Sequence, residues 1–384
     1  MRSTQANSGR LEVENATLSL RPTVRSSLAM TLGGMADAFL YAYLPLNATT
    51  LELNAFSVGA ILSINKFVRV LSNRWVNALA AVTGLKHIVS MAICLAALTS
   101  MSYAFEMPLW FWLLVRVVWG ISYSMFRFAS VQYVQVAPHK GEALGIATSI
   151  KELGPVLAYW FGPIVLTTWG ASPVFLTSAV ATLMGMALLH NLPNPKAKVV
   201  LKEVVRFQKP NWLDAWVFIS SFLIDGFVVV TVSILLRSHA NFWSEHVLMN
   251  TAIFISMRRV FQIILAPLTG SAIRRYGHRL VFALSSVLIC VALGFMAGGI
   301  IVEALVIVFA AAAVNNVCMP LFALQRSSTR ENYNAFAKLS TAKDIGAAVG
   351  ALIGLPLVGV VEPRWIFSVL CVGSTYTLYR VLRR

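Results

Sequence analysis

The sequence predicts an all-α membrane protein in which twelve transmembrane helices form two pseudo-symmetric six-helix bundles. Hydrophobic residues make up 58% of the 384 residues. Charged residues make up only 12%, where a soluble domain carries about 25%. Twelve apolar stretches are each long enough to cross a hydrocarbon core of about 30 Å. Short sequence elements of the first half also recur in the second half in the same order, which indicates an internal duplication.

The twelve expected spans follow from the length and apolar character of each stretch. They cover residues 26–46, 55–82, 86–105, 108–136, 142–167, 172–191, 212–236, 246–273, 279–299, 302–325, 333–359 and 365–382. With their short loops they occupy nearly the whole chain. This leaves no room for a separate soluble enzyme domain, and we do not expect an enzyme.

Basic residues are distributed unevenly along this pattern. Of the 31 Lys and Arg residues, 21 lie in the tails and alternate loops or at the span ends beside them, two lie in the opposite loops and eight lie within spans. Basic residues are enriched on the cytoplasmic side of membrane proteins. We therefore expect both termini in the cytoplasm of a cell with a plasma membrane, such as the bacterial inner membrane. The net charge of +16 then reflects topology, not nucleic-acid binding.

A polar segment divides the chain into four parts. Residues 191–211 contain prolines near both ends and five basic residues, which is typical of a cytoplasmic linker. We expect a cytoplasmic tail at residues 1–25, an N-terminal six-helix bundle at residues 26–192, the linker at residues 193–211 and a C-terminal six-helix bundle at residues 212–384.

The repeat places chemically similar residues at equivalent positions of the two halves. SIKELG at 149–154 recurs as TAKDIG at 341–346, ADAF around Asp37 matches IDGF around Asp225, and Lys66 aligns with Arg259. The offsets lie between 188 and 193 residues. Three matches in the same order are hard to explain without duplication.

Several motifs on this framework resemble those of the major facilitator superfamily, whose two bundles are related by an axis along the membrane normal. The resembling segments are GSAIRRYGHR at 270–279, RVVWG at 116–120 and the Gly-Pro pairs at 154–155 and 162–163. The sequence departs from the family at Arg274, where the loop motif usually has an acid. The resemblance implies a secondary carrier that works by alternating access.

Basic and polar side chains form stripes within the expected spans. Lys66, Arg69 and Asn73 are spaced by three and four residues, which places them on one helix face. The eighth span, at residues 246–273, repeats the stripe with Arg259 and Gln262. The fourth span, at residues 108–136, adds Arg116 and Arg127. We expect a substrate-binding cavity lined by Lys66, Arg69, Asn73, Arg116, Arg258, Arg259 and Gln262. Structural pairing between helices is the alternative interpretation. It applies above all to Arg127, Lys151 and Lys343, for which we expect charge pairing.

A charge count favours an anionic substrate. Eight basic residues in the spans face four acids, Asp37, Glu152, Asp225 and Asp344. Even if every acid is paired, about four cations lack a protein partner, and an unpaired buried charge is costly. Arginine binds carboxylate or phosphate oxygens in a bidentate manner. We therefore expect a small organic anion, such as a polycarboxylate metabolite or a carboxylate-bearing chelator.

The four acids are the candidates for proton coupling. Asp37 and Asp225 lie near the middle of the first span of each half, and Asp37 has no basic residue within one turn of its own helix. Desolvation would favour the protonated form of such a carboxyl group. Glu152 and Asp344 each follow a lysine directly, so each needs a partner on another helix. For these two, a salt bridge between helices is as plausible as proton coupling.

Other functions remain as alternatives. A multidrug exporter with lipophilic cargo would have the same fold, although the surplus of buried cations argues against it. A sensor without transport is supported only by the eroded loop motifs. An ATP-driven pump is disfavoured because no P-loop motif is present.

The four cysteines lie in spans without metal-site spacing, so we expect no metal or cofactor. We also expect a monomer.

The uneven distribution of basic residues predicts the topology directly. A reporter that is active only outside the cytoplasm should be silent when fused after Lys209 or after Arg384, because both positions are expected in the cytoplasm. Reporter activity would be measured in cells that produce each fusion. Activity at either position would mean that the number of spans is odd or that their register is shifted.

Overall fold

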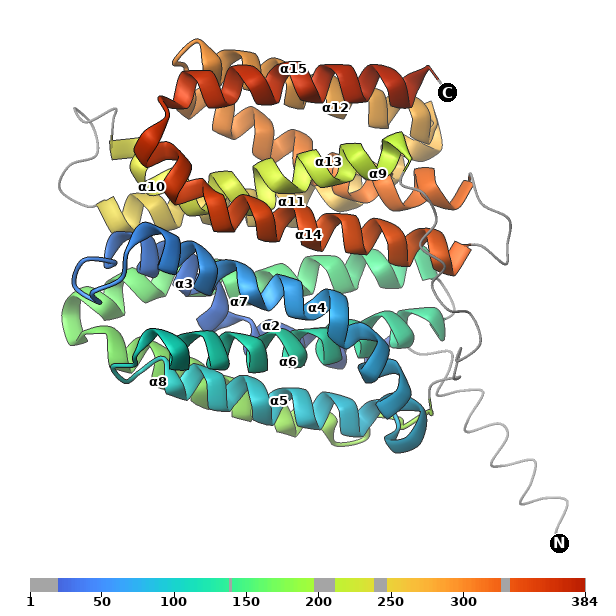
Figure 1. The fold of residues 1–384 in the computed structure, drawn as a ribbon. Coiled ribbons are helices and arrows are strands. Elements are labelled where there is room, and N and C mark those ends of the chain that lie inside the picture. Colours follow the sequence, from blue (N-terminus) through green and yellow to red (C-terminus); the bar gives the residue numbers. More distant parts are fainter. Residues whose placement is uncertain (1–19, 138–139, 197–210, 238–246, 326–331, 384) are drawn as a thin grey trace, which may run out of the picture.

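The computed structural model describes residues 20–137, 140–196, 211–237, 247–325 and 332–383. Regular secondary structure in these ranges is entirely helical. Figure 1 shows two stacked bundles of roughly parallel helices, one built from the first half of the chain and the other from the second half. The expected all-α fold is confirmed. Most of the expected tail and linker lies outside the described residues.

The first six expected spans coincide with helices of the N-terminal bundle. These are α2 (Arg21–Gly33) with α3 (Met35–Leu46), α4 (Ala55–Thr83), α5 (Leu85–Ser102), α6 (Leu109–Gln135), α7 (Lys140–Trp169), and α8 (Ala171–Met184) with the 3-10 turn η1 (Gly185–Leu189). Helix α2 begins at Arg21, five residues before the predicted boundary. Pro22 explains the early start, since proline is favoured in the first turn of a helix.

The last six expected spans coincide with helices of the C-terminal bundle. These are α9 (Trp212–Ser221), the π-helical segment η2 (Phe222–Val228) and α10 (Val229–Arg237) as one broken span, followed by α11 (Val247–Tyr276), α12 (His278–Ala297), α13 (Ile301–Gln325), α14 (Asn332–Val360) and α15 (Pro363–Leu382). The sequence pattern did not indicate that the first span of either half is broken.

Glycines let the first and fifth spans of each half approach closely. A Cβ atom at Gly154 of α7 would overlap the backbone oxygen of Thr31 in α2. At the repeat-equivalent position in α14, a Cβ atom at Gly346 would overlap the backbone oxygen of Phe218 in α9. In a bilayer, helices associate by close van der Waals packing, because lipid is as apolar as leucine. The two glycines therefore fix the same contact in both bundles.

The two halves meet along two helix pairs, α4 with α14 and α7 with α11. Gly59 of α4 packs so closely on α14 that an added Cβ atom would lie 2.5 Å from the Leu352 oxygen. Farther along α4, Lys66 contacts the backbone oxygen of Ala347 at 3.2 Å. Beyond this region α4 bends away from α14 (Figure 1). Contact along this pair is therefore concentrated in the first half of α4.

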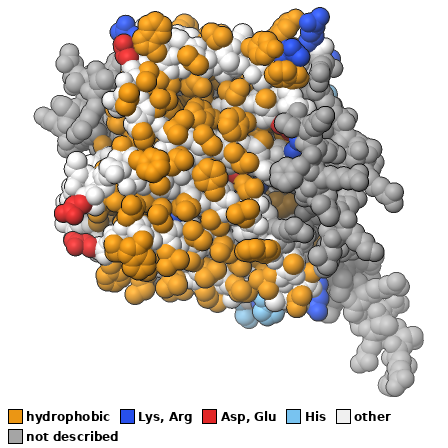
Figure 2. Space-filling model, viewed as in Figure 1, with side chains coloured by type: hydrophobic (Ala, Val, Ile, Leu, Met, Phe, Trp, Pro, Cys, Tyr) orange, Lys and Arg blue, Asp and Glu red, His pale blue; other side chains and the backbone are white. Residues whose placement is uncertain are grey.

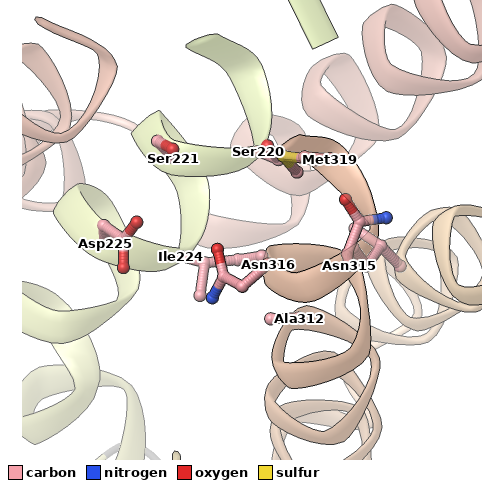
Figure 3. Close-up of a pocket in the computed structure, with 9 residues that line it drawn as sticks. Ser220, Ser221, Ile224, Asp225, Ala312, Asn315, Asn316 and Met319 are labelled. Carbon is pink, nitrogen blue, oxygen red and sulfur yellow. The ribbon is translucent and has the colours of Figure 1, made fainter. Parts of the chain in front are cut away.

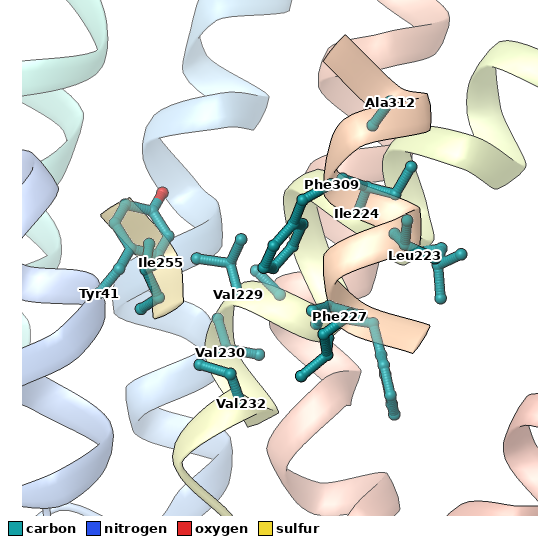
Figure 4. Packing of buried hydrophobic residues seen from close by; sticks show 14 of the residues in the cluster. Tyr41, Leu223, Ile224, Phe227, Val229, Val230, Val232, Ile255, Phe309 and Ala312 are labelled. Carbon is teal, nitrogen blue, oxygen red and sulfur yellow. The ribbon is translucent and has the colours of Figure 1, made fainter. Parts of the chain in front are cut away.

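The apolar core is continuous across this meeting point. Figure 4 shows Phe227 and Phe309 packed in the C-terminal bundle, with Tyr41 of α3 and Ile255 of α11 near Val229. All five side chains are buried. The core thus holds α3 of the N-terminal half against the broken seventh span, so the polar groups on these segments have fixed positions.

The outer surface is apolar, as expected for a protein in lipid. Among the described residues, ten helical segments are long and apolar enough to cross a membrane. The two further spans are α2 with α3, which is broken at Gly34, and α7, which carries charged residues in its interior. Figure 2 shows one face that is largely hydrophobic, with most of its visible charged side chains toward the two ends of the bundles.

The glycine contacts predict a specific loss of stability. Gly154→Ala and Gly346→Ala should each lower the free energy of unfolding by about 1–3 kcal/mol, because the new methyl group would overlap a backbone oxygen that cannot rotate away. Thermal unfolding of the purified protein in detergent would measure the change.

Each variant has a matched control in its own helix. Apart from the adjacent residues and nearby backbone of the same helix, no described atom lies within 4 Å of a Cβ atom added at Gly145 in α7 or at Gly359 in α14. Gly145→Ala and Gly359→Ala should therefore leave the unfolding temperature unchanged or raise it slightly. Equal destabilisation by all four changes would mean that helix flexibility, not close packing, is what these glycines provide.

Candidate functional site

Charged side chains from both halves gather at the centre of the molecule. Each of the four acids within the spans pairs with an arginine on a different helix: Asp37 with Arg116, Asp225 with Arg258, Glu152 with Arg259, and Asp344 with Arg127. Every buried carboxylate therefore has a cation, as the high cost of an isolated buried charge requires. The sequence count did not indicate which cation belongs to which acid.

Two of these ion pairs connect the halves. Glu152 of α7 accepts from Arg259 of α11 at 2.5 Å, and Asp344 of α14 accepts from Arg127 of α6 at 2.8 Å. Glu152 and Asp344 are the repeat-equivalent acids. Each of them thus pairs with an arginine of the opposite half, and we call these two contacts the inter-half ion pairs.

Asp37 and Arg116 lie inside the N-terminal bundle. Arg116 is fully buried, and its Nε donates to the backbone oxygen of Ile61 at 2.9 Å. One of its terminal nitrogens contacts the Asp37 carboxylate and the Tyr103 hydroxyl. Asp37 has no basic residue within one turn of its own helix, and its cation, Arg116, comes from α6. The expectation that Arg116 lines the cavity lacks support, since its side chain packs among α3, α4 and α5.

Asp225 has several polar neighbours in the C-terminal bundle. It lies in the π-helical segment, a local irregularity that is common at functional sites. Its carboxylate pairs with Arg258 and lies 3.6 Å from the Lys343 ammonium. Lys343 also donates to Asn316 at 2.8 Å, and the Asn316 amide donates to Gln262 at 3.2 Å. These contacts link the seventh span with α11, α13 and α14.

Lys66 reaches across the interface without meeting a carboxylate. Its side chain is 5% exposed, and its ammonium donates to the backbone oxygens of Asp225 at 3.0 Å and Ala347 at 3.2 Å. It also lies 5.1 Å from the centre of the Tyr41 ring. These neutral partners solvate the ammonium but leave its charge uncompensated.

Arg69 lies one helical turn farther along the same face of α4. It is 9% exposed, and its guanidinium stacks over the Tyr123 ring of α6 at 3.7 Å. Its Nε is buried and has no hydrogen-bond partner. A buried donor without a partner is unusual in a folded protein. Arg116 and Arg259 also have one such buried nitrogen without a partner, but each of them already pairs with a carboxylate, whereas Arg69 pairs with no described acid and is therefore the best prepared of the three to accept a further anionic group.

The remaining expected residues contribute unequally. Lys151 makes no hydrogen bond or ion pair to a described residue, although it lies within electrostatic range of Glu152 and Arg259. Gln262 is buried in the C-terminal network. Asn73 is half-buried and has no hydrogen-bond partner among the described side chains, so the structure does not join it to the cluster.

Sequence reasoning missed neutral members of the cluster. Tyr41 contacts Lys66 of α4, and Asn316 joins Lys343 to Gln262. An asparagine pair at 315–316 within an apolar span was the available signal, because amide groups are uncommon in lipid-facing positions. Tyr41 gave no such signal, since aromatic residues are frequent throughout the chain.

A small pocket lies beside Asp225. Figure 3 shows Asp225 and Asn316 facing the same space, with Ser221 and Ile224 on the same span as Asp225. Its cavity volume is about 10 Å³, which is room for about one water molecule. The pocket is therefore too small for an organic substrate in this conformation.

Two solved structures of the nucleoside transporter NupG have a similar fold. A NupG mutant aligns with a TM-score of 0.74 at 15% sequence identity, over 94% of this chain and 98% of that chain. NupG itself aligns with a TM-score of 0.71 at 13% identity, with the same coverage. At these identities the similarity concerns the fold alone.

Sequence comparison gives a second relationship. The maltose permease of Geobacillus stearothermophilus is 27% identical over 111 residues, which is 28% of this chain and 28% of the permease. The matched region thus spans about a quarter of that relative. The family model of the Major Facilitator Superfamily matches residues 26–351, which include almost every helix described above. This match shows that the chain, a multi-pass membrane protein and not an enzyme, belongs to the major facilitator superfamily of secondary transporters.

Proposed function

We propose that this transporter moves a small organic anion, with a polycarboxylate metabolite or a carboxylate-bearing chelator as the cargo class. The observation that carries the proposal is the imbalance of charge at the centre. All four acids are already paired with arginines, and Lys66, Arg69 and Lys151 pair with no described carboxylate. An anion bound between the halves would supply the missing charge.

Lys66 and Arg69 are the strongest candidates for binding this anion. Both are buried on one face of α4, and neither is neutralised by a described acid. A guanidinium stacked on an aromatic ring keeps its edge available for bidentate bonding to a carboxylate. Lys66 can exchange its two backbone oxygens for a charged partner without leaving a carboxylate unpaired.

Arg116, Arg258 and Arg259 are weaker candidates because each already has a carboxylate partner. Arg259 pairs with Glu152 across the interface, so it would have to exchange partners before it could bind cargo. Arg258 shares Asp225 with Lys343. We assign these arginines to organising the site, and Lys66 and Arg69 to direct contact with cargo.

Three other cargo classes serve as comparisons. The relatives are named as carriers of nucleosides and maltose, both of which contain many hydroxyl groups. A drug exporter would carry lipophilic compounds in a cavity dominated by aromatic residues. The buried cations without carboxylate partners favour the anion over each of these. We place the protein as a monomer in a plasma membrane, such as the bacterial inner membrane.

We further propose that transport is coupled to protons and that Asp225 is the carboxylate that couples them. Asp225 contacts Arg258 and Lys343 with its carboxylate and Lys66 with its backbone oxygen, so it senses both halves. Asp37 contacts only its own bundle through Arg116. If the two halves separate around Asp225, its backbone oxygen loses Lys66, and protonation of its carboxylate would release Arg258 and Lys343 within the C-terminal bundle.

The anion proposal predicts selective loss of binding. Lys66→Gln and Arg69→Gln should each weaken binding of a dicarboxylate or tricarboxylate about tenfold or more, since each removes a charge-assisted contact worth about 1.5–3 kcal/mol. Binding of a panel of such anions to the purified protein would be measured by calorimetry. Uridine, maltose and a lipophilic cation complete the panel.

A charge removed outside the site provides the control. Lys86→Gln lies at the start of α5 and should leave anion binding unchanged. Two results would oppose the anion proposal. One is normal anion binding by both site variants. The other is that the wild-type protein binds uridine, maltose or the lipophilic cation but binds none of the anions.

The coupling proposal predicts different behaviour of the two equivalent aspartates. Asp225→Asn mimics the protonated form, so it should abolish accumulation driven by a pH gradient while downhill exchange of cargo remains measurable. Asp37→Asn leaves Arg116 buried without its carboxylate and should mainly lower thermal stability, by about 3–5 kcal/mol. Transport would be measured in vesicles with and without an imposed gradient.

Accumulation by the Asp225→Asn protein in response to the gradient would remove Asp225 from the coupling mechanism. Loss of accumulation in Asp37→Asn, with stability intact, would return the assignment to Asp37. If neither change affects accumulation, Glu152 and Asp344 are the acids to test next.

A further inference from the structure

A groove lies at the end of the C-terminal bundle and shares no lining residue with the central charge cluster. It is lined by Tyr276, Gly277, His278, Arg279, Leu280, Ala283 and Leu382. These residues come from the end of α11, Gly277, the first turns of α12 and the last turn of α15. The cavity volume is about 520 Å³, much larger than that of the pocket beside Asp225.

The groove is basic on one side and has no acid nearby on its own helices. Arg274 and Arg275 occupy the last turn of α11, Arg279 the first turn of α12, and Arg383 the residue after α15. Helices α11, α12 and α15 contain no Asp or Glu at all. Figure 2 shows Lys and Arg side chains at the upper right, near the end of the bundle where Figure 1 marks the C-terminus.

The arginines at the groove keep donors available for a ligand. One terminal nitrogen of Arg279 donates to the backbone oxygen of Leu382 at 2.9 Å, which joins the start of α12 to the end of α15. Arg383 donates to the Tyr379 hydroxyl at 3.3 Å. These contacts use one donor of each guanidinium, which has five N–H groups. Neither arginine forms an ion pair with a described residue.

The other side of the groove continues into the apolar outer surface. Leu280 and Leu284 of α12 are about half exposed, and Tyr376 and Tyr379 of α15 are similarly exposed. Helices α12 and α15 pack side by side (Figure 1). A ligand that fits both parts must therefore carry an anionic group and a long apolar group.

We propose that this groove is a binding site for one anionic phospholipid, with the phosphate held by Arg279 and Arg383 and an acyl chain lying along α12 and α15. The apolar wall distinguishes a lipid from free phosphate, because inorganic phosphate would leave Tyr276, Leu280 and Leu382 uncovered. Basic pockets between membrane helices are suited to such head groups. The expected cytoplasmic position of this end places the groove at the level of the lipid head groups.

Lipid titration of the full chain tests the proposal. The delipidated protein in detergent would be titrated with phosphatidylglycerol and, separately, with phosphatidylcholine of the same acyl chains, and bound lipid would be counted by native mass spectrometry. We expect one phosphatidylglycerol to bind at least tenfold more tightly than phosphatidylcholine. Arg279→Gln should weaken this binding about fivefold, and the Arg279→Gln/Arg383→Gln double variant about 25-fold.

The repeat supplies a matched control. Lys86 lies two residues after Gly84, as Arg279 lies two residues after Gly277, so Lys86→Gln removes one charge at the equivalent position of the other half. It should leave phosphatidylglycerol binding within twofold of wild type. Arg279→Lys should restore part of the affinity lost in Arg279→Gln. The single variant Arg383→Gln changes an exposed side chain and tests the site without disturbing the contact between Arg279 and Leu382.

Four results would overturn the proposal. They are unchanged phosphatidylglycerol binding by the double variant, an equal loss in Lys86→Gln, equal affinity for phosphatidylcholine, and displacement of the lipid by millimolar inorganic phosphate. The measurement reports binding without transport, so its outcome is independent of the cargo proposed above.

Discussion

The arrangement of this protein depends on the need to compensate charge in an interior that water does not solvate. Eight cations and four acids lie in the interior of the spans, away from the span ends, and an unpartnered charge at that depth is expensive. The acids therefore determine where the arginines lie. Because Glu152 and Asp344 take their partners from the opposite half, the same requirement also holds the two bundles in register.

The broken seventh span illustrates how backbone geometry contributes to this compensation. In the π-helical segment around Asp225, the carboxylate contacts Arg258 and the backbone oxygen accepts from Lys66. A regular helix would present these two groups differently, because a π-turn shifts the helix by one residue. Irregular backbone at this depth is tolerated where other protein groups form hydrogen bonds with its free N–H and C=O groups. The Lys66 ammonium forms one such hydrogen bond, to the backbone oxygen of Asp225.

Sequence reasoning predicted the fold well because the relevant signals are long and repeated. Each apolar stretch averages over about 20 residues, and the offsets between halves recur around Asp37, Lys66 and SIKELG. The breaks at Gly34 and around Asp225 escaped prediction. They depend on contacts between helices, such as that of Gly33 with the Phe126 ring, which no local pattern encodes.

The candidate site was predictable in its composition but not in its pairing. Burial and sign of charge can be inferred from the position of a residue in a span, so Arg69 and Asp225 could be named. Which cation neutralises which acid depends on helix rotation, and a rotation of about 100° separates adjacent residues such as Arg258 and Arg259. For this reason the pairing of Arg116 with Asp37 could not be predicted.

The inter-half ion pairs constrain how such a molecule can change conformation. If the halves separated at this depth, Glu152 and Asp344 would lose Arg259 and Arg127, and removing one partner of a buried pair costs about 3–5 kcal/mol. Lys151, which has no ion pair here, follows directly before Glu152 but points about 100° away from it. It cannot replace Arg259 without a change in helix geometry. A movement that keeps these pairs at the pivot, and opens the halves on either side of them, avoids the cost. The central position of the charges is thus compatible with alternating access, whereas full separation of the bundles is not.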